Sequence, residues 1–175
     1  VPAMSLKPLV APLAAALKGR SVALSDDCVG PEAERTVAAL GDGQIALLEN
    51  VRYHAGEEKN DAALAKQIAA LGDLYVNDAF SAAHRAHAST EGVAHVVAKR
   101  GGQCAAGLLM ERELKFLGDE LESPARPFVV ILGGAKVSDK LGLIRGLLSS
   151  ANTIIIGGAM AYTLQFVQGV SVGKS

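Results

Sequence analysis

The stretch FVVILGGAKVSDK, residues 128–140, joins an unbroken apolar run to two glycines and then to a polar segment with two lysines. A short, continuous apolar run is typical of a strand that is covered on both faces of a parallel sheet. The paired glycines permit a tight turn, and the polar residues after them predict a helix that begins near Ser138. The stretch therefore predicts a strand, a turn and a helix in succession, which is the repeating unit of an α/β fold.

The same alternation extends in both directions from this stretch. Further strand-sized apolar runs are residues 21–25, 44–48, 74–77 and 153–156. Helices are predicted at residues 5–18, 31–40, 62–71 and 105–121, and another is predicted to begin near Met160. This order predicts parallel sheets flanked by helices. Two prolines, Pro124 and Pro127, close the longest predicted helix, so we expect one domain to end and another to begin there.

Composition narrows the functional classes. Half of the 175 residues are apolar and 20% are charged, which is typical of a globular protein. The 17 basic residues are balanced by 18 acidic ones, so we expect no nucleic-acid partner, and no apolar run is long enough to cross a membrane. No secretory pattern is recognisable near Val1, and we expect a cytoplasmic protein. Cys28 and Cys104 are expected to be reduced thiols that fill small positions in the core.

Basic residues gather where two predicted strands end, which is where parallel α/β sheets bind their ligands. The strands at residues 44–48 and 74–77 are followed by two arginines and three histidines: Arg52, His54, His84, Arg85 and His87. Guanidinium groups bind carboxylate and phosphate oxygens through paired hydrogen bonds. The cluster therefore predicts a site for a small anion.

Other interpretations of this cluster stay open at the level of sequence. Arg52 and Arg85 could instead pair with Asp78 or Glu49 in a buried ionic network. The last two histidines of the cluster have the spacing of a metal-binding pair, but no cysteine or second histidine pair lies nearby, so we expect no metal site there. Four neighbouring carboxylates are expected to be solvated loop or helix-cap charges rather than general acids: Asp26, Asp27, Glu57 and Glu58.

A second cluster follows the strands at residues 128–132 and 153–156. Its members are Gly133, Gly134, Ala135, Lys136, Lys140, Gly157 and Gly158. Paired glycines let a backbone approach a ligand closely, and the helix that follows offers N–H groups to phosphate. The two lysines, four residues apart, are expected to share one helix face. The alternative is a plain strand-to-helix turn with solvated lysines, because the motif matches neither the P-loop nor the dinucleotide fingerprint.

Four motifs, taken together, resemble the phosphoglycerate kinase family. They are ENVRYH at residues 49–54, NDAFSAAHRAHAS at 77–89, LGGAKVSDK at 132–140 and GGAMAYT at 157–163. They occur in the family's order and spacing, and the resemblance covers essentially the whole chain. It implies a phosphotransferase that moves a phosphoryl group between 1,3-bisphosphoglycerate or 3-phosphoglycerate and ADP or ATP in glycolysis. It also implies Mg²⁺ bound with the nucleotide, and a monomer when complete.

The resemblance implies parts of two Rossmann-like domains: residues 1–104 of the glycerate-substrate domain, an interdomain helix at 105–122, and the start of the nucleotide-binding domain at 123–175. The phosphate end of the glycerate substrate would be bound by Arg52 and Arg85, with His84 and His87 in support. Arg85 and Lys136 are the implied catalytic residues, because Lys136 would neutralise the transferring group. Lys140 and the glycines would contact the nucleotide.

Several of the family's segments have no counterpart between Val1 and Ser175. These are an N-terminal Asp-x-Asn strand, a further arginine, an HLGRP motif, a ribose-binding glutamate and a GGGD loop. We therefore expect the 175-residue stretch to be inactive when expressed by itself. The alternative is a truncated, non-catalytic fragment that binds anions or nucleotides.

Overall fold

The computed structural model describes residues 2–134 and 136–174. The chain forms two compact units, Val1–Leu114 and Lys115–Ser175, which are described one at a time. Among the described residues, no helix combines the length and the apolar character that crossing a membrane requires.

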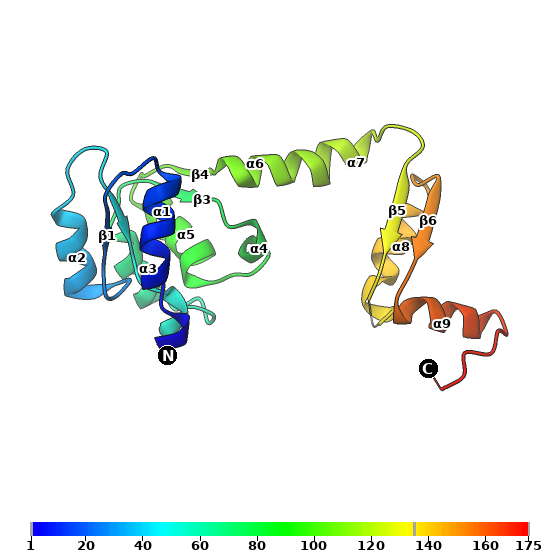
Figure 1. The fold of residues 1–175 in the computed structure, drawn as a ribbon. Coiled ribbons are helices and arrows are strands. Elements are labelled where there is room, and N and C mark those ends of the chain that lie inside the picture. The colour runs from blue at the N-terminus through cyan, green and yellow to red at the C-terminus, as the bar shows by residue number, and fades with distance from the viewer. Residues whose placement is uncertain (1, 135, 175) are drawn as a thin grey trace. The chain divides into compact units, whose positions relative to one another are not determined.

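Four short strands of the first unit form two parallel pairs (Figure 1). In one pair, β1 (Val22–Leu24) lies beside β2 (Ile45–Leu47), with Val22 opposite Ile45. In the other, β3 (Tyr75–Asn77) lies beside β4 (Cys104–Ala106). The strands β1, β2 and β3 confirm the sequence prediction, and because they are parallel, the segments that follow β1 and β2 leave the same edge of their sheet.

Helices connect these strands; those at residues 5–18, 31–40 and 62–71 were predicted, whereas the two between β3 and β4 were not. They are α1 (Val10–Ala16), α2 (Gly30–Ala38), α3 (Ala62–Ala69), α4 (Phe80–Ala83), α5 (Val93–Lys99) and α6 (Leu108–Leu114). Asp61 caps α3, because its carboxylate accepts the backbone N–H groups of Ala63 and Leu64. The N-terminal segment is less helical than predicted: Pro8 lies in a 3₁₀ turn, Lys7–Leu9, and the α-helix begins only at Val10.

The core of the first unit lies around α3 and α5, which pack against each other. One buried cluster consists of Cys28, Val29, Leu64, Ala65 and Ala88, and a second one of Ala69, Val93 and Val97. Full burial of one of the valine or leucine side chains contributes about 1.5–3 kcal/mol to folding, and burial of an alanine contributes less. The first cluster packs the segment after β1 against α3 and against the turn at Ala88. It therefore holds in place the polar loops that follow β1, β2 and β3, which we call the polar edge.

The helix predicted at residues 105–121 is wrong at its start. Residues Cys104–Ala106 form the strand β4, and the helix begins at Leu108. Gly107 separates the two: its N–H donates to the Asn77 carbonyl, while the Asp78 carboxylate accepts the N–H of Met110. Beyond Leu114 the helical backbone continues through a π-helical turn, Lys115–Asp119, into α7 (Glu120–Glu122).

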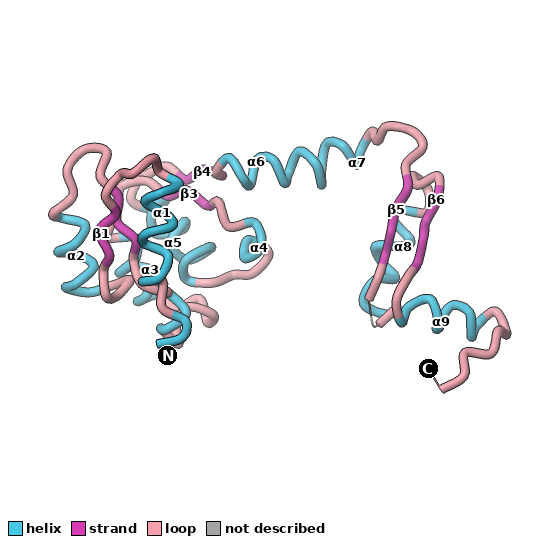
Figure 2. The backbone as a smooth tube through the Cα atoms, viewed as in Figure 1, coloured by secondary structure: helices cyan, strands magenta, loops and turns pink. Residues whose placement is uncertain are grey.

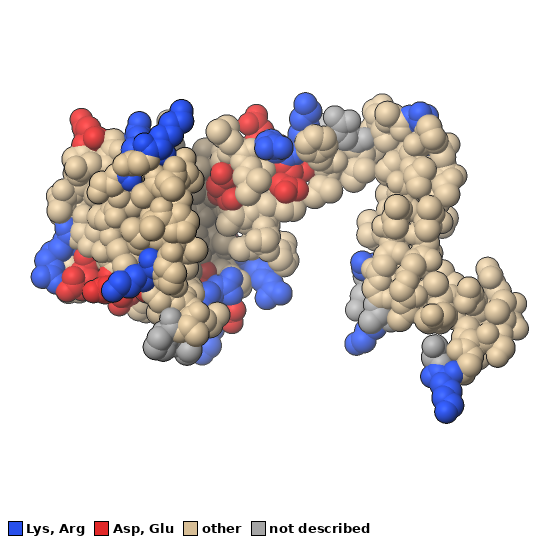
Figure 3. All heavy atoms as spheres, viewed as in Figure 1, with Lys and Arg blue, Asp and Glu red and all other residues tan. Residues whose placement is uncertain are grey.

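The second unit contains one parallel strand pair, β5 (Val129–Leu132) and β6 (Thr153–Ile156), in full register (Figure 2). Both strands were predicted, as were the helices after them, α8 (Leu141–Leu147) and α9 (Ala159–Val167). Many apolar side chains stay exposed, with Ile131 at 75% and Phe166 at 69%. Figure 3 shows few charged side chains on the visible face of this unit.

Candidate functional site

Arg52 is placed at the polar edge by a single turn of 3₁₀ helix, Val51–Tyr53, directly after β2. The turn forms because the Asn50 side chain accepts the backbone N–H of Arg52 at 3.0 Å. The Arg52 side chain is 38% exposed, and its Nη2 lies 3.1 Å from Nδ1 of His87. The structure thus brings together two of the basic residues that the sequence predicts.

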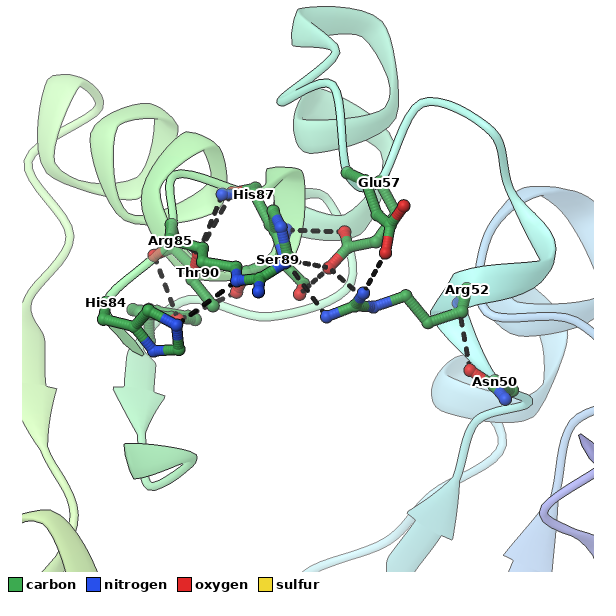
Figure 4. A network of polar contacts seen from close by, with 10 residues as sticks. Asn50, Arg52, Glu57, His84, Arg85, His87, Ser89 and Thr90 are labelled. Carbon is green, nitrogen blue, oxygen red and sulfur yellow. Dashed lines mark hydrogen bonds and ion pairs between the residues drawn. The ribbon is translucent and has the colours of Figure 1, made fainter. Parts of the chain in front are cut away.

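A buried carboxylate lies behind these two side chains (Figure 4). Glu57 is only 1% exposed, and its Oε2 accepts the backbone N–H of Ser89 at 2.9 Å. Its Oε1 lies 3.9 Å from Nδ1 of His87 and 4.0 Å from Nε of Arg52. The prediction that Glu57 is a solvated charge is therefore wrong, and the polar cluster contains an acidic member that the sequence did not reveal.

Arg85 and His84 form the exposed part of the cluster. Nε of Arg85 donates to Nε2 of His84 at 3.2 Å, and within the described ranges Arg85 forms no ion pair. Arg85 lines a cavity of about 280 Å³, and Arg52 lines another of about 300 Å³. Asn77 and Thr90 line both cavities, so Arg52 and Arg85 line two adjoining cavities at the end of β3.

The alternative of a buried ionic network with Asp78 or Glu49 is also wrong. Arg52 pairs instead with Glu58, which is 64% exposed, and at 4.0 Å with the buried Glu57. The Asp78 carboxylate is engaged with the backbone of α6. Glu49 accepts the Ser5 hydroxyl and the backbone N–H of Leu6, and these hydrogen bonds lower the pKa of its carboxyl group.

Three other side chains at this edge could hold a metal ion. One possible ligand atom each of Asp27, Cys28 and His54 lies within 4.8 Å of the others. In the structure they are joined by hydrogen bonds: Nε2 of His54 lies 2.7 Å from Asp27 Oδ1, which also accepts the Cys28 N–H. Partial burial acts to raise the pKa of Asp27, but the bonds from His54 and the backbone outweigh it, and the pKa is lowered.

The two cysteines should differ sharply in reactivity. Burial, and then the negative charge of Asp27, raise the pKa of Cys28 to about 11, whereas Cys104 is exposed and is not the core residue that was predicted. At pH 8 roughly one Cys28 in a thousand is then a thiolate.

Under native conditions, we expect iodoacetamide to label Cys104 at least tenfold faster than Cys28, as mass spectrometry of peptides can measure. Equal rates would contradict the buried position of Cys28.

In the second unit, the two glycine turns lie side by side at the ends of β5 and β6. The N–H of Gly157 donates to the Leu132 carbonyl at 2.8 Å, and the N–H of Met160 donates to the Gly134 carbonyl at 3.1 Å. Gly134 has φ +154°, and a Cβ atom there would come within 3.3 Å of the buried Met160 sulfur. A glycine is required at this position, because a side chain would be strained and would crowd the turn.

The two lysines do not share a helix face, so that prediction is wrong. Lys136 lies in the loop before the helix, exposed, without a hydrogen bond or ion pair to any described residue. Lys140 ends a 3₁₀ turn, Ser138–Lys140, and its ammonium donates back to the Gly133 carbonyl at 2.8 Å. Ala135, which was also predicted to contact a nucleotide, lies outside the described residues. Among the described residues, none engages the Lys136 ammonium, whereas the Lys140 ammonium is held at the Gly133 carbonyl.

The comparison with known proteins decides the family. The sequence profile of phosphoglycerate kinase matches residues 1–175. The chain belongs to the phosphoglycerate kinase family. It is 55% identical over 179 residues to the phosphoglycerate kinase of Koribacter versatilis, covering 99% of this chain and 43% of that protein. It is 57% identical over 159 residues to that of Moorella thermoacetica, covering 91% of this chain and 39% of the relative.

Solved phosphoglycerate kinase structures share the fold. The enzyme from Coxiella burnetii has a TM-score of 0.72 at 39% identity, with 98% of this chain and 41% of that chain covered. The one from Pyrococcus horikoshii OT3 has a TM-score of 0.80 at 30% identity, with 97% and 42% covered. The two-domain Rossmann-like fold implied by the motifs is thereby confirmed as the class of architecture. The chain spans well under half the length of these phosphoglycerate kinases.

Proposed function

We propose that this chain is part of a phosphotransferase that moves a phosphoryl group between 3-phosphoglycerate and ATP, and in reverse between 1,3-bisphosphoglycerate and ADP. The observation that carries the proposal is that each unit has cationic side chains where its strands end, in a chain that belongs to the phosphoglycerate kinase family. In the forward direction a carboxylate oxygen of 3-phosphoglycerate attacks the γ-phosphorus. The bond from that phosphorus to the β,γ-bridging oxygen breaks, and ADP leaves with the electron pair of that bond.

The first unit is proposed to bind the glycerate substrate. Arg52 and Arg85 would bind its phosphate group, because both residues line adjoining cavities and guanidinium groups bind phosphate oxygens. His84 supports Arg85 through the contact at 3.2 Å, and His87 supports Arg52 through the contact at 3.1 Å. Each charged hydrogen bond to phosphate would contribute about 1.5–3 kcal/mol.

The second unit is proposed to bind the nucleotide. The turns at Gly133–Gly134 and Gly157–Gly158 would let the phosphates approach the backbone, with Lys140 beside them. Lys136, which no described residue engages, would neutralise the charge of the transferring group, which is the main demand of phosphoryl transfer. We propose that Mg²⁺ arrives with the nucleotide on its phosphate oxygens, as is usual for this ion.

The remaining parts of the proposal concern the setting of the enzyme. Residues 1–104 would belong to the glycerate domain, 105–122 to the helix between domains, and 123–175 to the nucleotide domain. The family's reaction belongs to glycolysis, so we propose a cytoplasmic enzyme that acts as a monomer on small molecules.

Binding measurements with matched variants of the full-length protein test this assignment. We expect Arg85→Ala to raise the Kd for 3-phosphoglycerate at least tenfold and to leave the Kd for Mg-ADP within twofold. Lys140→Ala should do the reverse, because the two residues lie on different units. Isothermal titration calorimetry gives both constants for each variant. If each variant weakened the binding of both ligands equally, the assignment of the glycerate to the first unit and of the nucleotide to the second would be contradicted.

A further inference from the structure

Glu57 combines full burial with a negative charge, which is costly unless the carboxylate has several partners. Its main chain and its side chain bind the same short segment. The Glu57 carbonyl accepts the N–H of Ala88 at 2.9 Å, while the carboxylate accepts the N–H of Ser89 at 2.9 Å and its hydroxyl at 2.5 Å. The loop after Arg52 is thus fastened to the segment that carries His87.

The carboxylate oxygen that accepts the Ser89 hydroxyl, Oε1, also faces the two basic residues. Arg52 Nε and His87 Nδ1 lie 4.0 Å and 3.9 Å from Glu57 Oε1, and they are joined to each other through Arg52 Nη2. Among the partners of Arg52 that the structure describes, Glu58, bound by Nη1, is the one exposed to solvent. A charged pair in water is easily exchanged for a ligand, whereas the buried contacts are not.

We propose that Glu57 is a positioning residue for the anion site: it fixes the orientation of the Arg52 guanidinium and of His87, and so aims them at the glycerate phosphate. The inference rests on the proposed function, in which Arg52 binds that phosphate. Glu57 touches no reacting atom in this account, and its effect is transmitted entirely through Arg52 and His87. Pre-orientation of a binding group lowers the cost of ordering it when the ligand arrives.

Glu58 provides a matched control, because both glutamates face Arg52 and each loses one negative charge on mutation to glutamine. If charge alone mattered, Glu57→Gln and Glu58→Gln would both make the site more positive and both tighten anion binding. If position matters, only Glu57→Gln, which alters the buried carboxylate, should weaken the binding of the anion. The two variants therefore separate orientation from electrostatics.

The test measures the Kd for 3-phosphoglycerate by calorimetry in the full-length protein, with Arg52→Ala as the reference for the proposed function. We expect Glu57→Gln to raise this Kd at least fivefold, to leave the nucleotide KM within twofold, and to shift or broaden the NMR signal of Arg52 Nε–H. Glu58→Gln should not raise the Kd. If Glu57→Gln fails to fold, Ser89→Ala, which removes one bond to Glu57, should weaken binding in the same direction by about threefold.

The possible outcomes separate the two claims. Arg52→Ala without effect on the Kd would overturn the role of Arg52 in the proposed function, and the inference with it. If Arg52→Ala raises the Kd for 3-phosphoglycerate but Glu57→Gln leaves it unchanged, only the inference about Glu57 is overturned. An equal tightening by both glutamine variants would show a charge effect and would also overturn it.

Discussion

Replacing Lys136 by alanine in the full-length protein should lower kcat by about 10²–10³-fold while raising the nucleotide KM far less. Lys136 is exposed in the loop after β5 and is not engaged by any described residue, so its ammonium is available to the transferring group. Charge on that group is neutralised more fully in the transition state than in the bound ground state. The expected loss corresponds to about 2.7–4 kcal/mol, as for one preorganised electrostatic donor.

Lys140→Ala is the matched control for this prediction, because Lys140 is bonded to the Gly133 carbonyl and lies over the glycine turn. We expect it to act mainly on the nucleotide KM. Steady-state kinetics and thermal midpoints of both variants should be measured together. A Lys136→Ala protein that melts earlier but keeps its kcat would show that the lysine only stabilises the turn.

Replacing Arg52 or Arg85 by alanine should reduce kcat/KM for the glycerate substrate at least tenfold, which is about 1.4 kcal/mol. Arg85 has no ion pair within the described part of the chain, so its loss should leave the thermal midpoint nearly unchanged. Arg52 is joined to Glu58 and His87, so its removal should also lower the midpoint, because it leaves the buried Glu57 with one partner fewer.

Arg35 is a suitable control for both arginine variants. It lies on α2, and its pair with Glu32 is exposed on both sides, so Arg35→Ala removes an arginine of the same unit without touching the polar edge. Its kcat/KM should stay within twofold of the unmodified protein. Arginine variants at positions 52 and 85 that behave like Arg35→Ala would rule out the proposed substrate site.

Most of the strands were predictable because they are short apolar runs with a turn after them, as at residues 128–132 and 153–156. The strand β4 was missed, since Cys104–Ala106 is too short and too rich in alanine to differ from the start of a helix. Only its pairing with Tyr75–Asn77 makes it a strand. Boundaries of this kind depend on contacts between distant segments, which a local pattern does not contain.

The candidate site was also predictable only in part from the sequence. The basic residues could be located from their position after the strands, and the structure places His87 on Arg52 and His84 on Arg85. The buried position of Glu57 could not be located, because its neighbours at residues 54–60 are polar and resemble a solvated loop. Its burial arises from Ser89, more than thirty residues further along the chain.

The proposed function requires the full-length protein to transfer a phosphoryl group from a nucleotide to 3-phosphoglycerate. The most direct measurement incubates that protein with Mg-ATP labelled at the γ-phosphate and 3-phosphoglycerate, and follows the label by rapid quench. We predict that the label appears on the carboxyl group of the glycerate, and that transfer becomes at least a hundredfold slower in Lys136→Ala. Binding of both substrates without any transfer of label would contradict the account.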